Sequence, residues 1–137
     1  MDIEAVKKRF IEEVKLRAYE DRYIDREEEK EILKIAIQEG LGVDSARLAL
    51  QQVCAQSEYV METNLDQKAR EILEQFAKND GQVDKKEFDD AASIIHSAAQ
   101  GRLSQPLCRR KAKQIMIANG WPAREGFLKG GRWFSEI

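Results

Sequence analysis

Histidine is almost absent from this chain, and the common catalytic motifs are missing. His96 is the only histidine, so neither a two-histidine metal site nor an HExxH metalloprotease motif can form. The GxSxG, GxxxxGK(S/T) and GxGxxG motifs do not occur either. A pair of Cys108 and His96 would have no third group to orient it. We therefore expect a protein that is not an enzyme.

Cysteine and long apolar runs are equally scarce. Cys54 and Cys108 are the only cysteines and have no CxxC spacing, so we expect two buried thiols in a reducing compartment. No run approaches the roughly 18 apolar residues of a membrane helix, and we expect no membrane insertion. The first residues, MDIEAVKKRF, lack the apolar core of a secretion signal. The prediction is a cytoplasmic protein without a cofactor, of open oligomeric state.

Charge is nearly balanced over the whole chain but uneven along it. Charged residues make up 35% of the 137 positions, and the net charge is −2. Residues 102–137 hold eight Lys or Arg against two Glu, a net of +6, which leaves −8 for residues 1–101. The basic part either pairs with the acidic body or faces an acidic partner.

One pattern occurs twice. When residues 12–48 are laid over residues 71–107, nine of 37 pairs are identical, where unrelated segments would give about two. With helical spacing of apolar residues throughout, this predicts an all-α fold of about six helices in two pseudo-repeated three-helix units. We expect one helical domain over residues 1–119, with repeats at about 3–56 and 64–119. An irregular or hairpin tail would follow over 120–137.

Capping residues predict where the helices begin. Asn79-Asp80-Gly81 is the clearest turn, and Gly40 and Gly42 should end the second helix. The buried helix faces should include Ile37, Leu48 and Ile94. The expected helix starts are Ile3, Asp25, Asp44 or Ser45, Thr63 or Asn64, Asp84, and Ser104 with Pro106 in the first turn.

An acidic motif, Asp-x-x-(Ile/Val)-Asp-(Arg/Lys)-x-Glu, lies at residues 21–28 and again at 80–87. Its aspartate and glutamate, three residues apart, have the spacing of a capping box, which satisfies free N–H groups at a helix start. The alternative is a divalent metal, because Asp80, Asp84 and Glu87 match the second half of an EF-hand calcium loop laid over residues 76–87. Its first half lacks carboxylates, so only weak calcium binding would be expected.

The same motif, with helices on both sides, resembles TerB-like domains linked to tellurite resistance. The resemblance covers roughly residues 5–118, and Asp80, Asp84 and Glu87 carry it best, whereas Arg22 stands where the first copy should have glycine. It implies a helical bundle of two pseudo-repeated halves with acidic turns that are sometimes proposed to bind metal. It also implies an intracellular scaffold or sensor in stress-related or membrane-linked systems.

The chain ends in a basic and aromatic region. A hairpin turning at Gly130-Gly131, with residues 132–134 as its returning strand, would suit its glycines. Three roles are open: packing on the helical body, docking of another protein, or nucleic-acid binding. Our leading hypothesis is a module that binds another protein. The candidate residues are Arg109, Arg110, Trp121, Phe127, Arg132, Trp133 and Phe134.

Overall fold

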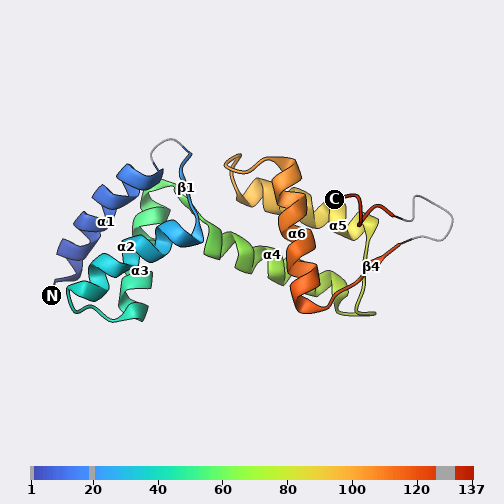
Figure 1. The fold of residues 1–137 in the computed structure, drawn as a ribbon, viewed down its shortest axis with the longest axis horizontal. Helices are drawn as coiled ribbons and strands as arrows, with labels where there is room; N and C mark the ends of the chain where they lie inside the picture. The colour runs from blue at the N-terminus through green and yellow to red at the C-terminus, as the bar shows by residue number, and fades with distance from the viewer. Residues whose placement is uncertain (1, 19–20, 126–131) are drawn as a thin grey trace. The chain divides into compact units, whose positions relative to one another are not determined.

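The computed structural model describes residues 2–18, 21–125 and 132–137, and it confirms the all-α class (Figure 1). Within these residues the helices are α1 (Ile3–Ala18), α2 (Arg26–Gln38), α3 (Val43–Ser57), α4 (Glu62–Ala77), α5 (Lys85–Ala98) and α6 (Gln105–Asn119). The strands have two residues each: β1 (Tyr23–Ile24), β2 (Val60–Met61), β3 (Val83–Asp84) and β4 (Ala123–Arg124).

The chain divides into two compact units, residues 1–63 (unit 1) and residues 64–137 (unit 2). One helical domain over residues 1–119 with a tail over 120–137 stays a prediction. Among the described tail residues, β4 pairs with β3 and Trp133 packs on Phe88 of α5. Unit 1 carries 10 Lys or Arg against 15 Asp or Glu, a net of −5, and unit 2 carries 13 against 10, a net of +3.

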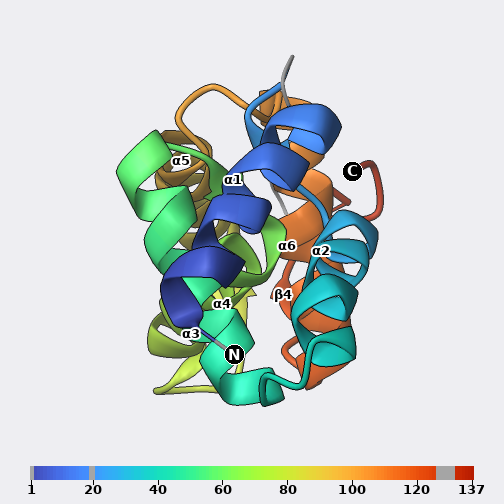
Figure 2. The same cartoon turned by 90° about the vertical axis from the view of Figure 1, so that its left-hand side faces the viewer.

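Unit 1 is built from α1, α2 and α3, each in contact with the other two. Figure 2 faces this unit, with α1 in front and α2 and α3 on either side of it. Strands β1 and β2 pair in parallel, with Tyr23 opposite Val60 and Ile24 opposite Met61. The core consists of apolar side chains spaced three and four residues apart along the helices, mainly Val6, Phe10, Val14, Ile32, Ala36, Ala46, Leu50 and Val53.

Unit 2 contains α5, α6 and most of α4, and its strands β3 and β4 also pair in parallel. Val83 lies opposite Ala123 and Asp84 opposite Arg124. The core of the unit is formed by the inward faces of all three helices together with one residue of β3 and one tail residue. Its largest members are Leu65, Leu73, Val83, Phe88, Ile95, Cys108, Met116 and Trp133.

The order of elements is the same in both units: a helix, a short strand, two helices and a second strand. The turns before the first strands also correspond, because Arg22 (φ 50°) and Gly81 (φ 74°) both have left-handed backbone conformations. Glycine adopts this conformation at little cost, whereas arginine does so rarely. This shared order is compatible with the predicted duplication, which itself stays a prediction.

The capping-box interpretation of the acidic motif is confirmed at both positions. The Asp25 side chain accepts a hydrogen bond from the Glu28 backbone N–H at 2.8 Å, and the Glu28 side chain accepts one from the Asp25 N–H at 3.2 Å. Asp84 and Glu87 repeat the arrangement at 2.8 and 3.0 Å. These residues begin α2 and α5, and Ser104 begins α6 in the predicted way.

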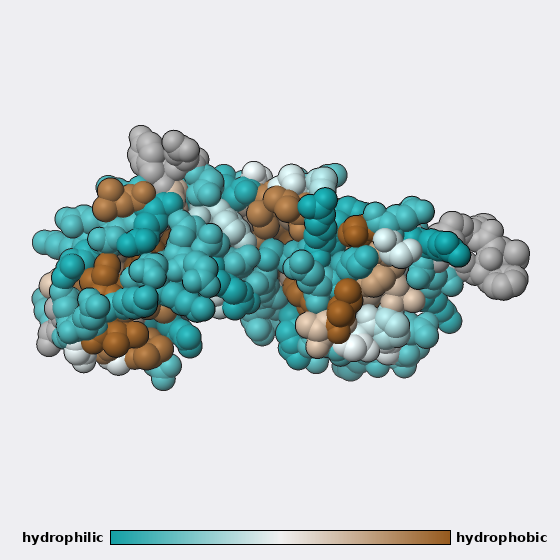
Figure 3. All heavy atoms as spheres, in the orientation of Figure 1, coloured by the Kyte–Doolittle hydropathy of each residue, from teal (hydrophilic) through white to brown (hydrophobic). Residues whose placement is uncertain are grey.

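Three apolar residues predicted to be buried are exposed. Leu48 is 58% exposed, Ile37 46% and Ile94 41%. In α3 the buried residues Ala46, Ala49, Leu50 and Val53 already complete the inward stripe of a helix, and Leu48 lies outside that stripe. Apolar residues consequently appear as separate patches within a largely hydrophilic surface (Figure 3).

Two predictions about local structure were wrong. Helix α3 begins at Val43 with Gly42 as its N-cap, so Asp44 and Ser45 lie inside the first turn. Residues 132–134 form a turn and not the returning strand of a hairpin. The predicted hairpin turn at Gly130-Gly131 lies outside the described residues.

Candidate functional site

The carboxylates of the acidic turn in unit 2 are occupied by local bonds. Asp84 and Glu87 cap α5, and Asp80 accepts a hydrogen bond from the Gln82 N–H at 3.0 Å. The other Asp80 oxygen lies 3.9 Å from Arg124 Nη1. Each carboxylate therefore has a structural role in starting α5 or shaping the turn before it.

Metal binding at this turn finds no direct support in the arrangement. Calcium needs several oxygen ligands that converge on one point. Among the residues that the structure describes, no group of three or more His, Cys, Asp or Glu side chains is placed to hold a metal ion. Weak calcium binding by Asp80, Asp84 and Glu87 stays a prediction, and calorimetry with calcium would test it.

Both cysteines are buried free thiols, as predicted. Cys54 lies in α3 of unit 1 and Cys108 in α6 of unit 2. Burial, with a smaller contribution from the charge of Glu29, raises the pKa of Cys54 to about 12. Burial also raises the pKa of Cys108. A thiol with a raised pKa forms little thiolate near neutral pH and is a poor nucleophile.

The tail segment, residues 132–137, lies against α5 and α6 through its aromatic side chains. Trp133 is only 8% exposed, and its ring centroid is 5.1 Å from that of Phe88 in α5. Phe134 meets Phe88 and Trp133 edge to face, at 6.2 and 5.5 Å. Such tilted ring pairs add to the stabilisation that comes from area burial. The packing role considered for the tail therefore applies to Trp133.

Lys113 of α6 ties the tail segment to the helix. Its Nζ donates hydrogen bonds to the backbone oxygens of Phe134, at 2.9 Å, and Ile137, at 3.4 Å. The same ammonium group lies 4.9 Å from the centroid of the Phe134 ring, within the range of a cation–π contact. One lysine thus holds both ends of the segment that follows Trp133.

Arg109 of α6 bridges to α5. Its guanidinium donates to Asp89 at 2.8 Å and lies 5.1 Å from the centroid of the Phe88 ring. Lys85 donates to the second oxygen of Asp89 at 3.1 Å. Burial by itself would raise the pKa of Asp89, but the hydrogen bonds and charges of Arg109 and Lys85 outweigh it and lower that pKa. Two cations therefore share one ionised carboxylate.

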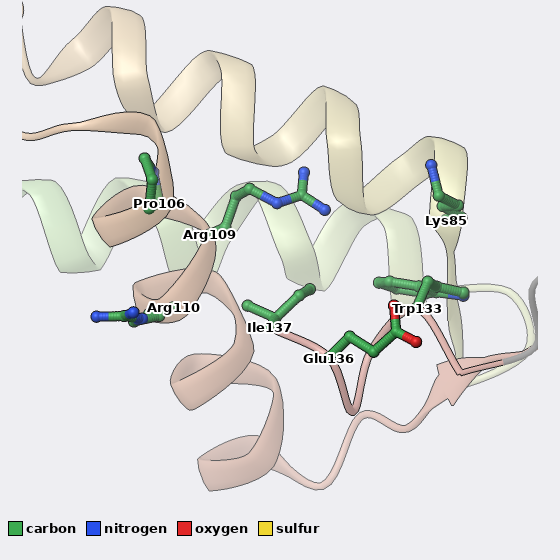
Figure 4. A pocket seen from close by; sticks show the side chains of 7 residues that line it. All are labelled: Lys85, Pro106, Arg109, Arg110, Trp133, Glu136 and Ile137. Atoms are coloured by element: carbon green, nitrogen blue, oxygen red, sulfur yellow. The ribbon is translucent and has the colours of Figure 1, made fainter.

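An open pocket of about 430 Å³ lies where α5, α6 and the tail segment meet, and we call it the basic pocket (Figure 4). Three of its side chains are cationic, one is acidic and three are apolar or aromatic. It is lined by Lys85, Pro106, Arg109, Arg110, Trp133, Glu136 and Ile137. A pocket that combines aromatic and cationic side chains suits the capture of an amphipathic ligand.

The predicted partner-binding residues only partly converge. Arg109, Arg110 and Trp133 line the basic pocket, and Phe134 packs beside Trp133. The remaining candidates do not line it. Trp121 lies elsewhere on unit 2, with the Arg70 guanidinium 6.0 Å from its ring, Arg132 is exposed, and Phe127 lies outside the described residues.

Four lining residues were not predicted: Lys85, Pro106, Glu136 and Ile137. In the sequence, Lys85 belongs to the capping motif and Pro106 to a first helical turn. Neither role signals that the two side chains approach the same cavity. Their convergence depends on how α5, α6 and the tail segment pack, which no local sequence signal encodes.

No protein-family description, curated protein or solved structure matches the chain. Within the described residues no helix is both long enough and apolar enough to cross a bilayer. The resemblance to TerB-like and EF-hand proteins stays a prediction. The chemistry of the basic pocket is therefore the observation from which a function can be inferred.

Proposed function

We propose that this protein is a non-enzymatic interaction module that binds another protein through the basic pocket of unit 2. The observation that carries the proposal is the convergence of Arg109, Arg110 and Trp133 on one open cavity. They come from two segments of the chain and meet because the tail segment packs against α6. Tryptophan and arginine are the residues most enriched at the energetic centres of protein interfaces.

The walls of the pocket are held in place before any partner binds. The Trp133 ring is fixed by Phe88 and Phe134, and Arg109 by Asp89. A site whose walls are already ordered loses less conformational entropy on binding. This preorganisation supports a binding function for the pocket. It suits a module that binds a partner without catalysing a reaction.

We further propose that the module is a cytoplasmic, stress-related scaffold or sensor. The TerB-like resemblance supports the role, and the two free thiols support a reducing compartment. That part of the proposal depends on the sequence resemblance and on the thiols. It has a separate test, which is the location of the tagged protein in cells.

Arg110 provides the sharpest test of the proposal. It is exposed, lines the pocket and forms no ion pair with any described residue, so its replacement should not disturb the fold. We expect Arg110→Glu to abolish capture of a partner that wild-type bait retains. The partner is identified by mass spectrometry, purified, and tested again in a two-component binding assay.

Lys68→Glu is the matched control. Lys68 is exposed on α4, a helix that contributes no residue to the pocket, and the substitution changes the charge by the same amount. Capture should survive this change, and both variants should keep the helical circular-dichroism spectrum of wild type. If Arg110→Glu bait retains every partner of the wild-type bait, the proposed site is wrong.

A further inference from the structure

The arrangement of charge around the basic pocket identifies the chemistry of its partner. We infer that the pocket binds a peptide segment in which one aliphatic or aromatic side chain stands between acidic residues. This inference rests on the proposed function and specifies the partner of the same site. It follows from two features: apolar side chains along the pocket and a cation near each end.

Apolar side chains line the pocket along its length. In Figure 4, Ile137 of the tail segment lies in the middle. Pro106 of α6 lies at the end that carries Arg110, and Trp133 lies at the end that carries Lys85. Because Trp133 is only 8% exposed, its ring is a fixed wall and not a side chain that must be ordered on binding. Burial of one apolar side chain here would contribute on the order of 25 cal/mol for each Å² removed from water.

Two cations lie at opposite ends of the pocket. In Figure 4, Lys85 lies above Trp133 at one end, and its ammonium group points away from the ring. Arg110 lies below Pro106 at the other end, and its guanidinium points away from Ile137. Arg109 lies between them and points toward α5, where Asp89 holds it. Both Lys85 and Arg110 are exposed and line the pocket, so a ligand that fills its middle has a cation near each end. Carboxylates that flank an apolar side chain complement this pattern.

The two ends are not equivalent. Lys85 already pairs with Asp89, which also binds Arg109, whereas Arg110 forms no ion pair with any described residue. The contribution of Arg110 to partner binding should therefore exceed that of Lys85. Glu136, which also lines the pocket, repels an acidic ligand.

A peptide suits this site better than nucleic acid does. Nucleic-acid binding depends on several cations that are free to neutralise successive phosphates. Around the pocket most cations are already engaged: Lys85 and Arg109 by Asp89, Lys111 by Asp66 at 2.7 Å, and Lys113 by backbone oxygens. Nucleic acid is tested as the competing outcome.

The test uses the full chain and short fluorescein-labelled synthetic peptides in fluorescence anisotropy. The first peptide has a central leucine flanked by glutamates, the second replaces its glutamates with glutamine, and the third replaces its leucine with serine. We expect measurable binding only for the first, with an affinity that decreases as salt increases. A single-stranded oligonucleotide and a duplex are titrated in parallel.

Three variants test whether each charge near the pocket raises or lowers the affinity for the first peptide. Arg110→Glu should weaken binding of the first peptide about tenfold, because it replaces the least engaged cation with a repelling charge. Glu136→Gln should strengthen binding about twofold to fivefold, because it removes the opposing charge. Lys68→Glu should change affinity less than about twofold, because α4 does not line the pocket.

The inference is overturned if the glutamine peptide binds as well as the glutamate peptide, or if Glu136→Gln fails to strengthen binding. It is also overturned if an oligonucleotide binds more tightly than the first peptide in a manner that depends on Arg110. Absence of binding for all three peptides, with capture of a partner still lost in Arg110→Glu, would refute the acidic peptide and leave the proposed function standing. Capture that is unchanged in Arg110→Glu would refute both.

Discussion

Asp84 illustrates how one side chain contributes to stability in this fold. Its carboxylate accepts the Glu87 N–H at the start of α5, and replacement by alanine would leave that N–H without its partner. We expect Asp84→Ala to lower the free energy of unfolding by about 1 kcal/mol. Urea unfolding followed by circular dichroism measures the change, and Asp25→Ala in unit 1 should cost a similar amount. No loss in either variant would contradict the capping role.

Asp89 should make the stability of the folded protein depend on pH, and its lowered pKa sets the direction. Because its pKa is lowered in the folded protein, its ion pairs stabilise the fold above the carboxyl pKa of the unfolded chain, about 3.9. This stabilisation is lost as the pH falls through the lower, folded pKa. We expect Asp89→Asn to be less stable than wild type at pH 7 and equally stable in strong acid. Thermal unfolding across pH measures both curves, and a constant difference would contradict the assignment.

At the scale of elements, the tail segment is part of the core of unit 2. Trp133 is packed on Phe88 and contributes a buried ring, although its indole N–H has no hydrogen-bond partner among the described residues. We expect Trp133→Ala to lower the free energy of unfolding by about 3 kcal/mol. Trp133→Phe retains an aromatic ring and should lose clearly less. Urea unfolding followed by circular dichroism compares them, and equal stability of the alanine variant and wild type would mean that the tail does not support the core.

Helices were predictable from the sequence because their signals are local. Asp84 with Glu87, and Ser104 with Pro106, mark helix starts within one turn of the chain. The parallel pairing of Val83 with Ala123 has no such signal, because its partners are distant in sequence and two-residue strands show no alternation.

The candidate site was only half predictable for the same reason. Basic and aromatic composition pointed to Arg109, Arg110 and Trp133. Lys85 and Glu136 reach the pocket only through tertiary packing. Composition therefore identified which residue types could bind a partner. The position of the cavity that they line depends on tertiary packing and is visible only in the structure.

At the scale of the molecule, the two units have separate cores and opposite net charges. All tryptophans lie in unit 2 (Trp121 and Trp133) and all tyrosines in unit 1 (Tyr19, Tyr23 and Tyr59). Each unit therefore has its own spectroscopic reporter. This separation allows the stability of unit 1 to be changed while unit 2 and its pocket are observed.

Leu50, fully buried in unit 1, is the position for this experiment. We expect Leu50→Ala to lower the stability of unit 1 by about 3 kcal/mol, through lost burial and a residual cavity. The transition seen by tyrosine fluorescence should shift to lower urea, and the one seen by tryptophan fluorescence should not. Equal shifts of both signals would show that the units unfold as one cooperative body.

Photo-crosslinking tests whether a partner protein contacts the basic pocket. The most direct measurement is photo-crosslinking with p-benzoylphenylalanine placed at position 110, or at position 68 as the control, in otherwise unchanged chains. We expect a covalent adduct with the captured partner from position 110 and none from position 68. Equal adducts from both positions, or an adduct from position 68 alone, would contradict it.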